Sequence, residues 1–418
     1  MVFSALPKSM NRLRKTNNRA LSVAVLTQGG TEWIGGLIYI SNVLRALSVL
    51  PDGERIPVSQ IALCTSRQAK LDEMGAFHLD SRRYTFRATD TLADKLRGAK
   101  QGLLHATWPC SLEAAVTRTK AMVAFPSLAS LGREFPIPWI GWIPDFQHKR
   151  LPHFFPPEEL RRRDERYQGV VNDARHLVVS SEDARRDLVQ WFPIEPSRVS
   201  VFPFVSVLDG EWYEGEPSRV AAQFQLPEKF LIFPSQFWIH KNHRVLFEAI
   251  RILRDKGLSD ICLVSTGHTN DHRHPDYFVG LQDFLRLHGL NPHVRILGLL
   301  PRNEEIQLLR RAVAVIQPSR FEGWSALVED ARALGKRMYV SDIPVHREQQ
   351  PPRAVFFPVD RGDELAELVA KDWADLQPGP DCPSEREAQA KQHDRTLVFA
   401  RAFLQILERT VAAGRAGP

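Results

Sequence analysis

Residues 318–333, P-S-R-F-E-G-W-S-A-L-V-E-D-A-R-A, combine residue types and spacings that could bind an anion. A predicted strand ends at Ile316, a glycine turn follows at Gly323, and a predicted helix begins near Trp324. The N-terminus of that helix would present free backbone N–H groups, which together with the helix dipole favour an anion such as a phosphate. These groups belong to Trp324, Ser325 and Ala326.

Two carboxylates flank this predicted helix N-terminus. Glu322 stands directly before it, where a carboxylate could accept hydrogen bonds from sugar hydroxyls. Asp330 follows eight positions later, about two turns deeper along the helix, and could reach the ribose of a nucleotide sugar. The alternative is structural: Glu322 would complement the helix dipole and Asp330 would face solvent.

A second candidate phosphate loop is T-Q-G-G-T-E-W-I-G-G, with glycines at 29, 30, 35 and 36. Glycines between a strand and a helix let the backbone approach a phosphate closely. The spacing is not G-x-G-x-x-G, so a dinucleotide site is weakly supported, and a tight turn remains the alternative.

Two further segments carry ionisable groups. The run W-I-P-D-F-Q-H-K-R-L-P-H-F-F, after a predicted strand ending near Ile143, places Asp145, His148, Lys149 and Arg150 on the ligand-binding side of its domain. The histidines at 268, 272 and 274 lie in a polar segment without cysteines, so a solvated loop is favoured over a zinc site. The chain contains no D-x-D, and we therefore expect no metal requirement and no metal ligands.

Short apolar runs alternate with amphipathic stretches along the whole chain, which predicts parallel sheets wrapped by helices. The first set of predicted strands is 21–27, 56–63, 102–107, 122–125, 139–143, 176–179 and 199–202, with helices at 158–172 and 182–190. The second set is 230–233, 261–265, 294–297, 313–316, 337–340 and 354–356. Its helices include 302–312, opening with an Asn303 cap, and 324–334, ending at Gly335.

The two sets predict an α/β chain of two doubly wound, Rossmann-like domains facing a cleft, with ligands at the carboxyl ends of the strands. We expect an N-terminal domain at 1–205, a loop-like linker at 206–227 and a second domain at 228–383. A C-terminal helix at 384–418 would pack back on the N-terminal domain.

The stretch S-R-F-E-G-W-S-A-L-V-E-D-A-R-A-L-G, followed by V-S-D-I-P-V-H-R-E-Q, resembles the retaining glycosyltransferases of family 4, which have the GT-B fold. The resemblance is strong over residues 230–349 and weaker before them. It implies transfer of a sugar from a nucleotide diphosphate sugar to an acceptor hydroxyl with retained configuration. The domain at 1–205 would then be the acceptor-side domain, and the domain at 228–383 would bind the nucleotide sugar. The leaving phosphate would take the acceptor proton.

The resemblance also implies roles for individual residues. Lys241 and Gln236, in P-S-Q-F-W-I-H-K-N-H, match two positions that hold the donor diphosphate, the first usually an arginine in the family. Glu322 matches the acid that orients the donor sugar. The second acid, on the ribose, matches Asp330 or its neighbour Glu329.

Other matches come from loops. Gly35 and Gly36 match a loop that touches donor phosphates and acceptor, and Gly298 ends a strand whose backbone contacts the base. His148 is the candidate for a catalytic histidine beside the reacting carbon, with His153 second. The predicted catalytic set is therefore His148, Lys241 and Glu322.

Composition limits the function classes. The chain has 418 residues, 43% hydrophobic residues and a formal net charge of +6, without a secretory signal or an apolar stretch that could span a membrane. We expect a cytoplasmic protein with four reduced cysteines. The arginines of 161–166 and the basic stretch 82–100 could contact an anionic membrane or simply be solvated.

The sequence thus predicts a glycosyltransferase of polysaccharide biosynthesis, whose acceptor is a glycan or a lipid-linked glycan. A nucleotide-sugar epimerase or hydrolase on the same fold is the alternative. A nucleic-acid or phosphate-ligand binding protein is a remote alternative, because the sequence shows no stripe of aromatic and basic residues. We therefore expect no nucleic-acid partner.

Overall fold

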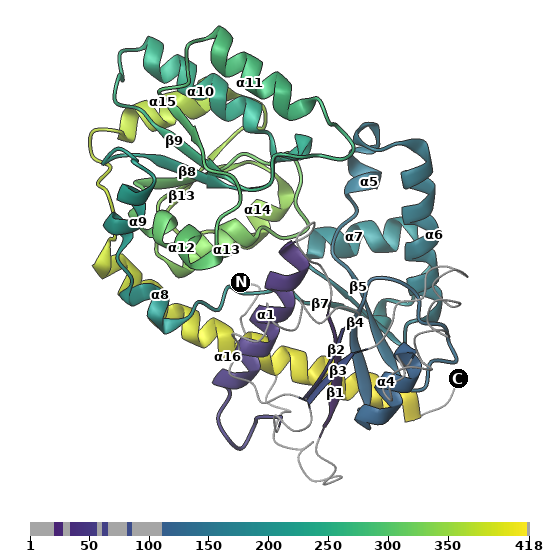
Figure 1. Ribbon diagram of the computed structural model, residues 1–418. Coiled ribbons are helices and arrows are strands. Elements are labelled where there is room, and N and C mark those ends of the chain that lie inside the picture. The colour runs from purple at the N-terminus through teal and green to yellow at the C-terminus, as the bar shows by residue number, and fades with distance from the viewer. Residues whose placement is uncertain (1–20, 28–33, 57–60, 66–81, 86–110, 416–418) are drawn as a thin grey trace, which may run out of the picture.

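The computed structural model of the protein describes residues 21–27, 34–56, 61–65, 82–85 and 111–415. These residues form two α/β domains, each built on a parallel sheet, which confirms the predicted fold class (Figure 1). The predicted strand at 102–107, the glycines at 29 and 30 and most of the basic stretch 82–100 lie outside the described residues.

The N-terminal sheet has seven strands in the order β3-β2-β1-β4-β5-β6-β7, and all neighbouring pairs are parallel. Strands β2 and β3 lie on one side of β1, and strands β4 to β7 follow on its other side, so the switch point of this domain lies between β1 and β4. The strands are β1 (Val23–Leu26), β2 (Ile61–Thr65), β3 (Arg82–Thr85), β4 (Val123–Ser127), β5 (Trp139–Ile143), β6 (His176–Val179) and β7 (Val199–Val201).

Helices cover both faces of this sheet, and two apolar clusters separate them from it. The helices are α1 (Ile34–Val49), α4 (Leu112–Thr119), α5 (Gln147–Arg150), α6 (Pro157–Asp173) and α7 (Glu182–Trp191), with 3-10 turns η4 (Pro152–Phe154) and η5 (Pro196–Arg198).

The C-terminal sheet has six parallel strands in the order β10-β9-β8-β11-β12-β13, so its switch point lies between β8 and β11. The strands are β8 (Leu231–Pro234), β9 (Leu263–Thr266), β10 (Val294–Ile296), β11 (Ala314–Gln317), β12 (Met338–Ser341) and β13 (Ala354–Phe357). Around them lie η6 (Ile239–Lys241), α10 (His243–Asp255), α11 (Tyr277–Leu287), α12 (Arg302–Arg311), α13 (Ala326–Ala333), α14 (Pro344–Gln349) and α15 (Gly362–Asp372).

The strands form where apolar residues follow one another without interruption, because a parallel sheet covered by helices is buried on both faces. All four residues of β9 and of β11 are buried. Helix α10 shows the helical pattern instead: Leu246, Ile250 and Leu253 recur at helical spacing and pack into the C-terminal core.

The last helix, α16 (Cys382–Arg415), reaches across both domains (Figure 1). Its start is held by the C-terminal domain, where Glu385 accepts a hydrogen bond from Arg310 at 2.9 Å. Further along, Phe399 stacks on Phe202 with ring centroids 4.4 Å apart, within the core of the N-terminal domain. The helix therefore ties the two domains together.

Three local features differ from the sequence prediction. Strand β3, with the sequence R-R-Y-T, was not predicted, because a short polar edge strand has no apolar signal. Asn303 lies inside α12, which begins at Arg302 directly after Pro301. The linker 206–227 contains α8 (Gly210–Glu214) and α9 (Pro217–Gln223) and is not wholly loop-like.

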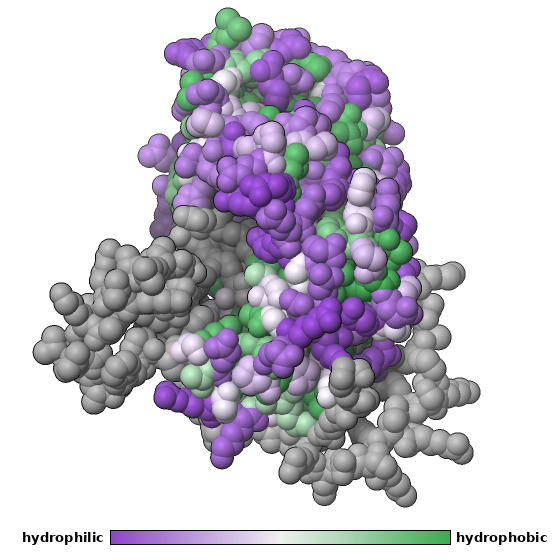
Figure 2. Space-filling model, turned by 90° about the vertical axis from the view of Figure 1, so that its right-hand side faces the viewer, coloured by the Kyte–Doolittle hydropathy of each residue, from purple (hydrophilic) through white to green (hydrophobic). Residues whose placement is uncertain are grey.

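Within the ranges given above, every helix falls short of the length or apolar character that crossing a bilayer requires. Figure 2 shows that hydrophilic residues predominate on the viewed face of the C-terminal domain, with hydrophobic residues scattered among them.

Candidate functional site

Lys241 and Glu322 meet at the switch point of the C-terminal domain. Lys241 ends η6, after β8, and Glu322 lies in the loop after β11. Since β8 and β11 are neighbours, their carboxyl ends bring the two side chains together. Lys241 Nζ lies 2.6 Å from Glu322 Oε1, and the side chains are only 17% and 9% exposed. The sequence prediction that these residues share one site agrees with this geometry.

The Glu322 carboxylate has a second partner in the core. Gln317 Nε2 donates to Glu322 Oε1 at 3.3 Å and to Ser325 Oγ at 2.6 Å. Gln317 is itself the last residue of β11, so its position is set by the sheet. Glu322 is thus oriented by one cation from the 3-10 turn after β8 and by one amide from the end of β11.

Buried imidazoles surround this ion pair. Burial lowers the pKa of His346 to about 4 although Glu322 lies near, and burial and then Lys241 lower the pKa of His243 to about 3. Both rings are therefore neutral at neutral pH. His346 Nδ1 lies 2.9 Å from the Ser341 carbonyl oxygen, while its Nε2 is buried without a hydrogen-bond partner.

The N-terminus of α13 differs from the prediction. The helix begins at Ala326, and Ser325 caps it by accepting a hydrogen bond from Val328 N–H at 3.3 Å. The Ser325 N–H donates to Gln349 Oε1 at 3.2 Å, so this group is not free for an anion. The Trp324 indole donates to the Phe204 carbonyl of the N-terminal half at 3.0 Å.

Neither predicted ribose-binding acid faces open solvent. Asp330 is buried, lies 2.5 Å from Arg302 Nη2 and accepts a hydrogen bond from the Ser206 hydroxyl. Glu329 is 0% exposed and lies 2.8 Å from Arg395 Nη2 of α16. In this arrangement both carboxylates hold neighbouring segments of the protein in place.

Gly323 is the point where the two domains touch beside this site. A Cβ added to Gly323 would overlap the Pro144 carbonyl oxygen and lie 2.8 Å from Asp145 Cβ. Only glycine permits this approach, which brings the loop of Glu322 against the loop that follows β5. The contact also places Asp145 next to the site.

A second interdomain contact lies at α7. The Glu348 carboxylate of α14 accepts hydrogen bonds from the backbone N–H groups of Glu182 and Asp183, at 2.7 and 3.1 Å. These are free groups of the first turn of α7, whose dipole favours an anion. Burial raises the pKa of Glu348, and these two hydrogen bonds act in the opposite direction.

His148, the predicted catalytic histidine, is not among the residues that line the interdomain cavity. Its side chain is 0% exposed, Nε2 lies 3.0 Å from Asp164 Oδ1, and the ring packs edge-on to Tyr167. Burial lowers the pKa of His148. His153, the second candidate, is exposed and packs against Phe154.

The neighbouring basic residues are also occupied within the N-terminal domain. Lys149 pairs with Asp164 at 2.7 Å, and Arg150 pairs with Asp183 and Asp187. Of the four groups predicted on this loop, Asp145 is the one that lines the cleft.

A cavity of about 630 Å³ lies between the domains, next to Gln236. His268 and His272 line it, so their segment is not simply a solvated loop. Among the residues that the structure describes, no group of three His, Cys, Asp or Glu side chains is placed to hold a metal ion.

The predicted glycines lie at the ends of elements. Gly35 and Gly36 are in the first turn of α1, the first exposed and the second buried. Gly298 follows β10 with a φ of 73°, and its carbonyl accepts a hydrogen bond from Gly267 N–H at 2.7 Å. Trp324 and α1 contribute to the same apolar cluster.

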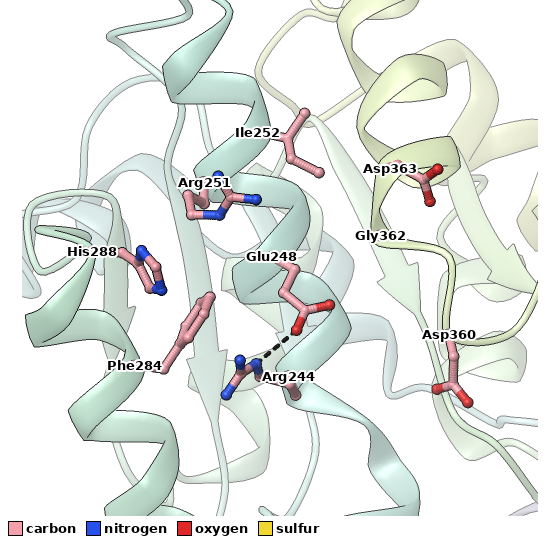
Figure 3. A pocket seen from close by; sticks show the side chains of 9 residues that line it. All are labelled: Arg244, Glu248, Arg251, Ile252, Phe284, His288, Asp360, Gly362 and Asp363. Atoms are coloured by element: carbon pink, nitrogen blue, oxygen red, sulfur yellow. Dashed lines mark hydrogen bonds and ion pairs between the residues drawn. The ribbon is translucent and has the colours of Figure 1, made fainter.

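A second cavity, of about 390 Å³, lies on the far side of the C-terminal domain between α10, α11 and α15 (Figure 3). Its charged side chains have partners: Arg244 pairs with Glu248 at 2.7 Å, and Arg251 pairs with Asp255.

The predicted membrane-facing arginines are partly neutralised as well, since Arg161 and Arg163 pair with acids one turn away on α6.

Sequence reasoning missed three residues of the cleft. Arg273 and Trp238 line the cavity, and Glu348 bridges the domains. Arg273 lies in the polar segment that the sequence analysis interpreted as a solvated loop, and nothing in the neighbouring sequence indicates that this side chain is buried. Glu348 is part of the V-S-D-I-P-V-H-R-E-Q stretch, which did single out this region.

Comparison with known proteins places these observations in a family context. Residues 216–375 match the family model described as "Glycosyl transferases group 1". A D-inositol 3-phosphate glycosyltransferase of Corynebacterium glutamicum is 25% identical over 263 residues, which is 60% of this chain and 60% of that protein. The chain thus spans about 60% of the length of this curated relative.

Solved structures show the same fold over nearly the whole chain. Anabaena HepE in complex with UDP and glucose has a TM-score of 0.65 at 15% identity and covers 93% of this chain and 99% of its own. Sucrose-phosphate synthase of Thermosynechococcus elongatus has a TM-score of 0.62 at 13% identity, covering 94% and 100%. Residues 216–375 of this chain therefore match the glycosyl transferases group 1 domain, within a two-domain α/β fold that the chain shares with these solved structures.

Proposed function

We propose that the protein is a retaining glycosyltransferase that moves a sugar from a nucleotide diphosphate sugar to an acceptor hydroxyl on a glycan or a lipid-linked glycan. The observation that carries the proposal is the Lys241–Glu322 pair, 2.6 Å apart at the switch point of the domain that matches the group 1 family. Doubly wound domains bind their ligands at this position.

The pair explains how a donor would be held. A diphosphate would give Lys241 a second anionic partner, and the resulting charge-assisted bond stabilises the negative charge that develops on the leaving group. Glu322 is already oriented by Gln317, and its carboxylate would accept hydroxyl hydrogen bonds of the donor sugar. Gln236 would add an amide donor where the family usually has an arginine.

Lys241 also supplies the cation that a metal supplies in other transferases. The reaction therefore needs no metal in this proposal. Treatment with EDTA is expected to leave turnover unchanged, whereas a loss that Mg²⁺ or Mn²⁺ restores would contradict this part of the proposal.

Turnover is the direct test of the function. The protein is incubated with a panel of nucleotide sugars and candidate acceptors, and the products are identified by NMR, which also reports the anomeric configuration. The Glu322→Ala variant should lose at least about a hundredfold in kcat, and the matched variant Glu387→Ala, at an exposed position on α16, should retain wild-type turnover.

The same products separate the alternatives. A new glycoside with the donor's anomeric configuration supports the proposal. Free sugar, or an altered nucleotide sugar formed without an acceptor, would show a hydrolase or an epimerase. Contact with an anionic membrane stays a prediction, which sedimentation with phosphatidylglycerol vesicles tests.

A further inference from the structure

The interdomain cavity has walls from both domains. One wall comes from the loops after β4 and β5 and from α6, and the other comes from the loops after β8 and β9. The lining includes Gln236 but neither Lys241 nor Glu322, so the cavity adjoins the proposed donor site and shares Gln236 with it.

Arg273 is a buried cation with too few hydrogen bonds. Its side chain is only 6% exposed, and its Nε is buried without a hydrogen-bond partner. The acids near it are Asp271, at 3.8 Å from Nε, and Glu159, at 4.0 Å from Nη1, and both distances exceed a hydrogen bond. Burial lowers the pKa of Arg273, since these acids compensate only in part for the lost water.

Those two acids are committed to other donors. Glu159 accepts a hydrogen bond from Arg163 Nε at 3.0 Å. Asp271 accepts from the backbone N–H of Ile239 at 3.2 Å and of Arg273 at 3.0 Å. A buried donor without a partner is destabilising, so the Arg273 guanidinium favours an acceptor group that enters the cavity.

Aromatic rings hold this guanidinium in place. Arg273 lies over Phe155 of the N-terminal domain at 4.5 Å from the ring centroid and over Trp238 at 5.9 Å. Arg163 lies over the same Phe155 ring at 4.8 Å. Two guanidinium groups from different domains are therefore fixed on one ring, and fixed planar forks suit a phosphate or a carboxylate.

Positive charges predominate on the cavity wall. Arg163, Arg166 and Arg273 line it, against the single carboxylate of Asp145. Asp145 Oδ1 accepts a hydrogen bond from Gln147 N–H at 3.0 Å, and Arg166 is exposed at the rim. Trp238, Leu128 and Tyr167 add flat apolar surface on which a sugar ring can pack.

Resting on the proposed function, we propose that the acceptor carries an anionic group, a phosphate or a carboxylate, and that this group binds between Arg273 and the arginines of α6. The acceptor would then lie beside Gln236 and Asp145, next to the donor site. Because its anion is held by both domains, acceptor binding stabilises the closed arrangement seen at Gly323.

The test uses inorganic phosphate, glucose 6-phosphate, glucuronate and neutral glucose as probes, titrated calorimetrically into the protein with and without saturating UDP. At least one anionic sugar should bind tenfold or more tightly than glucose, and phosphate should bind together with UDP. The phosphate and carboxylate probes show which anion is preferred. Equal affinity for all three sugars would overturn the proposal, as would phosphate and UDP displacing each other.

Variants assign the binding to these arginines. Arg273→Gln should lower the affinity for the preferred anion at least tenfold and leave the affinity for UDP unchanged. Arg166→Gln, at the exposed rim, should lower the affinity for the same anion severalfold. Arg162→Gln, an exposed change of equal charge on α6 outside the cavity, is the matched control. Wild-type anion affinity in both test variants would overturn the proposal. Anion binding without binding of either UDP or GDP would refute the proposed function and leave the anion site standing.

Discussion

Replacing Gly323 by alanine perturbs the contact that closes the cleft beside the Lys241–Glu322 pair. The added Cβ would overlap the Pro144 carbonyl and lie 2.8 Å from Asp145 Cβ, whereas carbon atoms in contact lie about 3.5–4.0 Å apart. The loop of Glu322 and the loop after β5 must therefore separate by about 1 Å. A misplacement of that size costs up to roughly a hundredfold in rate.

We expect Gly323→Ala to lower kcat/KM by about 10- to 100-fold, or about 1.4–2.8 kcal/mol of transition-state stabilisation. Nucleoside diphosphate release is the assay, and the radius of gyration from X-ray scattering should increase. Gly280→Ala on α11 is the matched control, because its Cβ would meet nothing within 4 Å. Turnover of Gly323→Ala within twofold of wild type, with an unchanged radius, would refute this reasoning.

Three further perturbations test the fold around the site. Burial lowers the pKa of His176 to about 4, so its contribution to stability is complete above pH 6.5 and is lost as the pH falls towards 4. Between pH 7 and pH 5 the free energy of unfolding, measured in urea, should fall by about 2 kcal/mol more in wild type than in His176→Gln, and equal losses would contradict this. Glu385→Ala leaves the buried Arg310 without its carboxylate and should lower the free energy of unfolding by about 3 kcal/mol, whereas Glu387→Ala, at an exposed ion pair, should lower it by less than about 0.5 kcal/mol. Similar melting temperatures of the two variants would show that the Arg310–Glu385 pair does not hold α16 on the C-terminal domain. Glu348→Gln removes the negative charge at the first turn of α7 and should open the cleft, which X-ray scattering would show as a larger radius of gyration. An unchanged radius of gyration would show that this contact does not keep the two domains closed.

The parts of the site that the sequence could predict are those set by strand order. Lys241 and Glu322 each follow a strand with a clear apolar signal, and neighbouring parallel strands end at one edge. The pattern of alternating strands and helices likewise predicted both sheets. What these predictions share is that they need only local sequence and the rules of parallel sheets.

The parts that failed depend on contacts between distant segments. His148 looked like a loop residue, but Asp164 and Tyr167 of α6 bury it. Arg273 looked solvated, but Phe155 of the other domain packs on it. The Ser325 N–H looked free, but Gln349 accepts its hydrogen bond. No pattern within one segment reveals which partner a second segment brings.

Binding of a nucleoside diphosphate tests the central claim, that Lys241 and Glu322 form a donor diphosphate site. UDP and GDP are titrated into wild type, Lys241→Ala and the exposed control Lys256→Ala. A charge-assisted bond to phosphate is worth about 1.5–3 kcal/mol, so the better nucleotide should bind Lys241→Ala at least about tenfold more weakly, and the control should match wild type. A folded Lys241→Ala variant that binds the nucleotide as tightly as wild type would contradict the account.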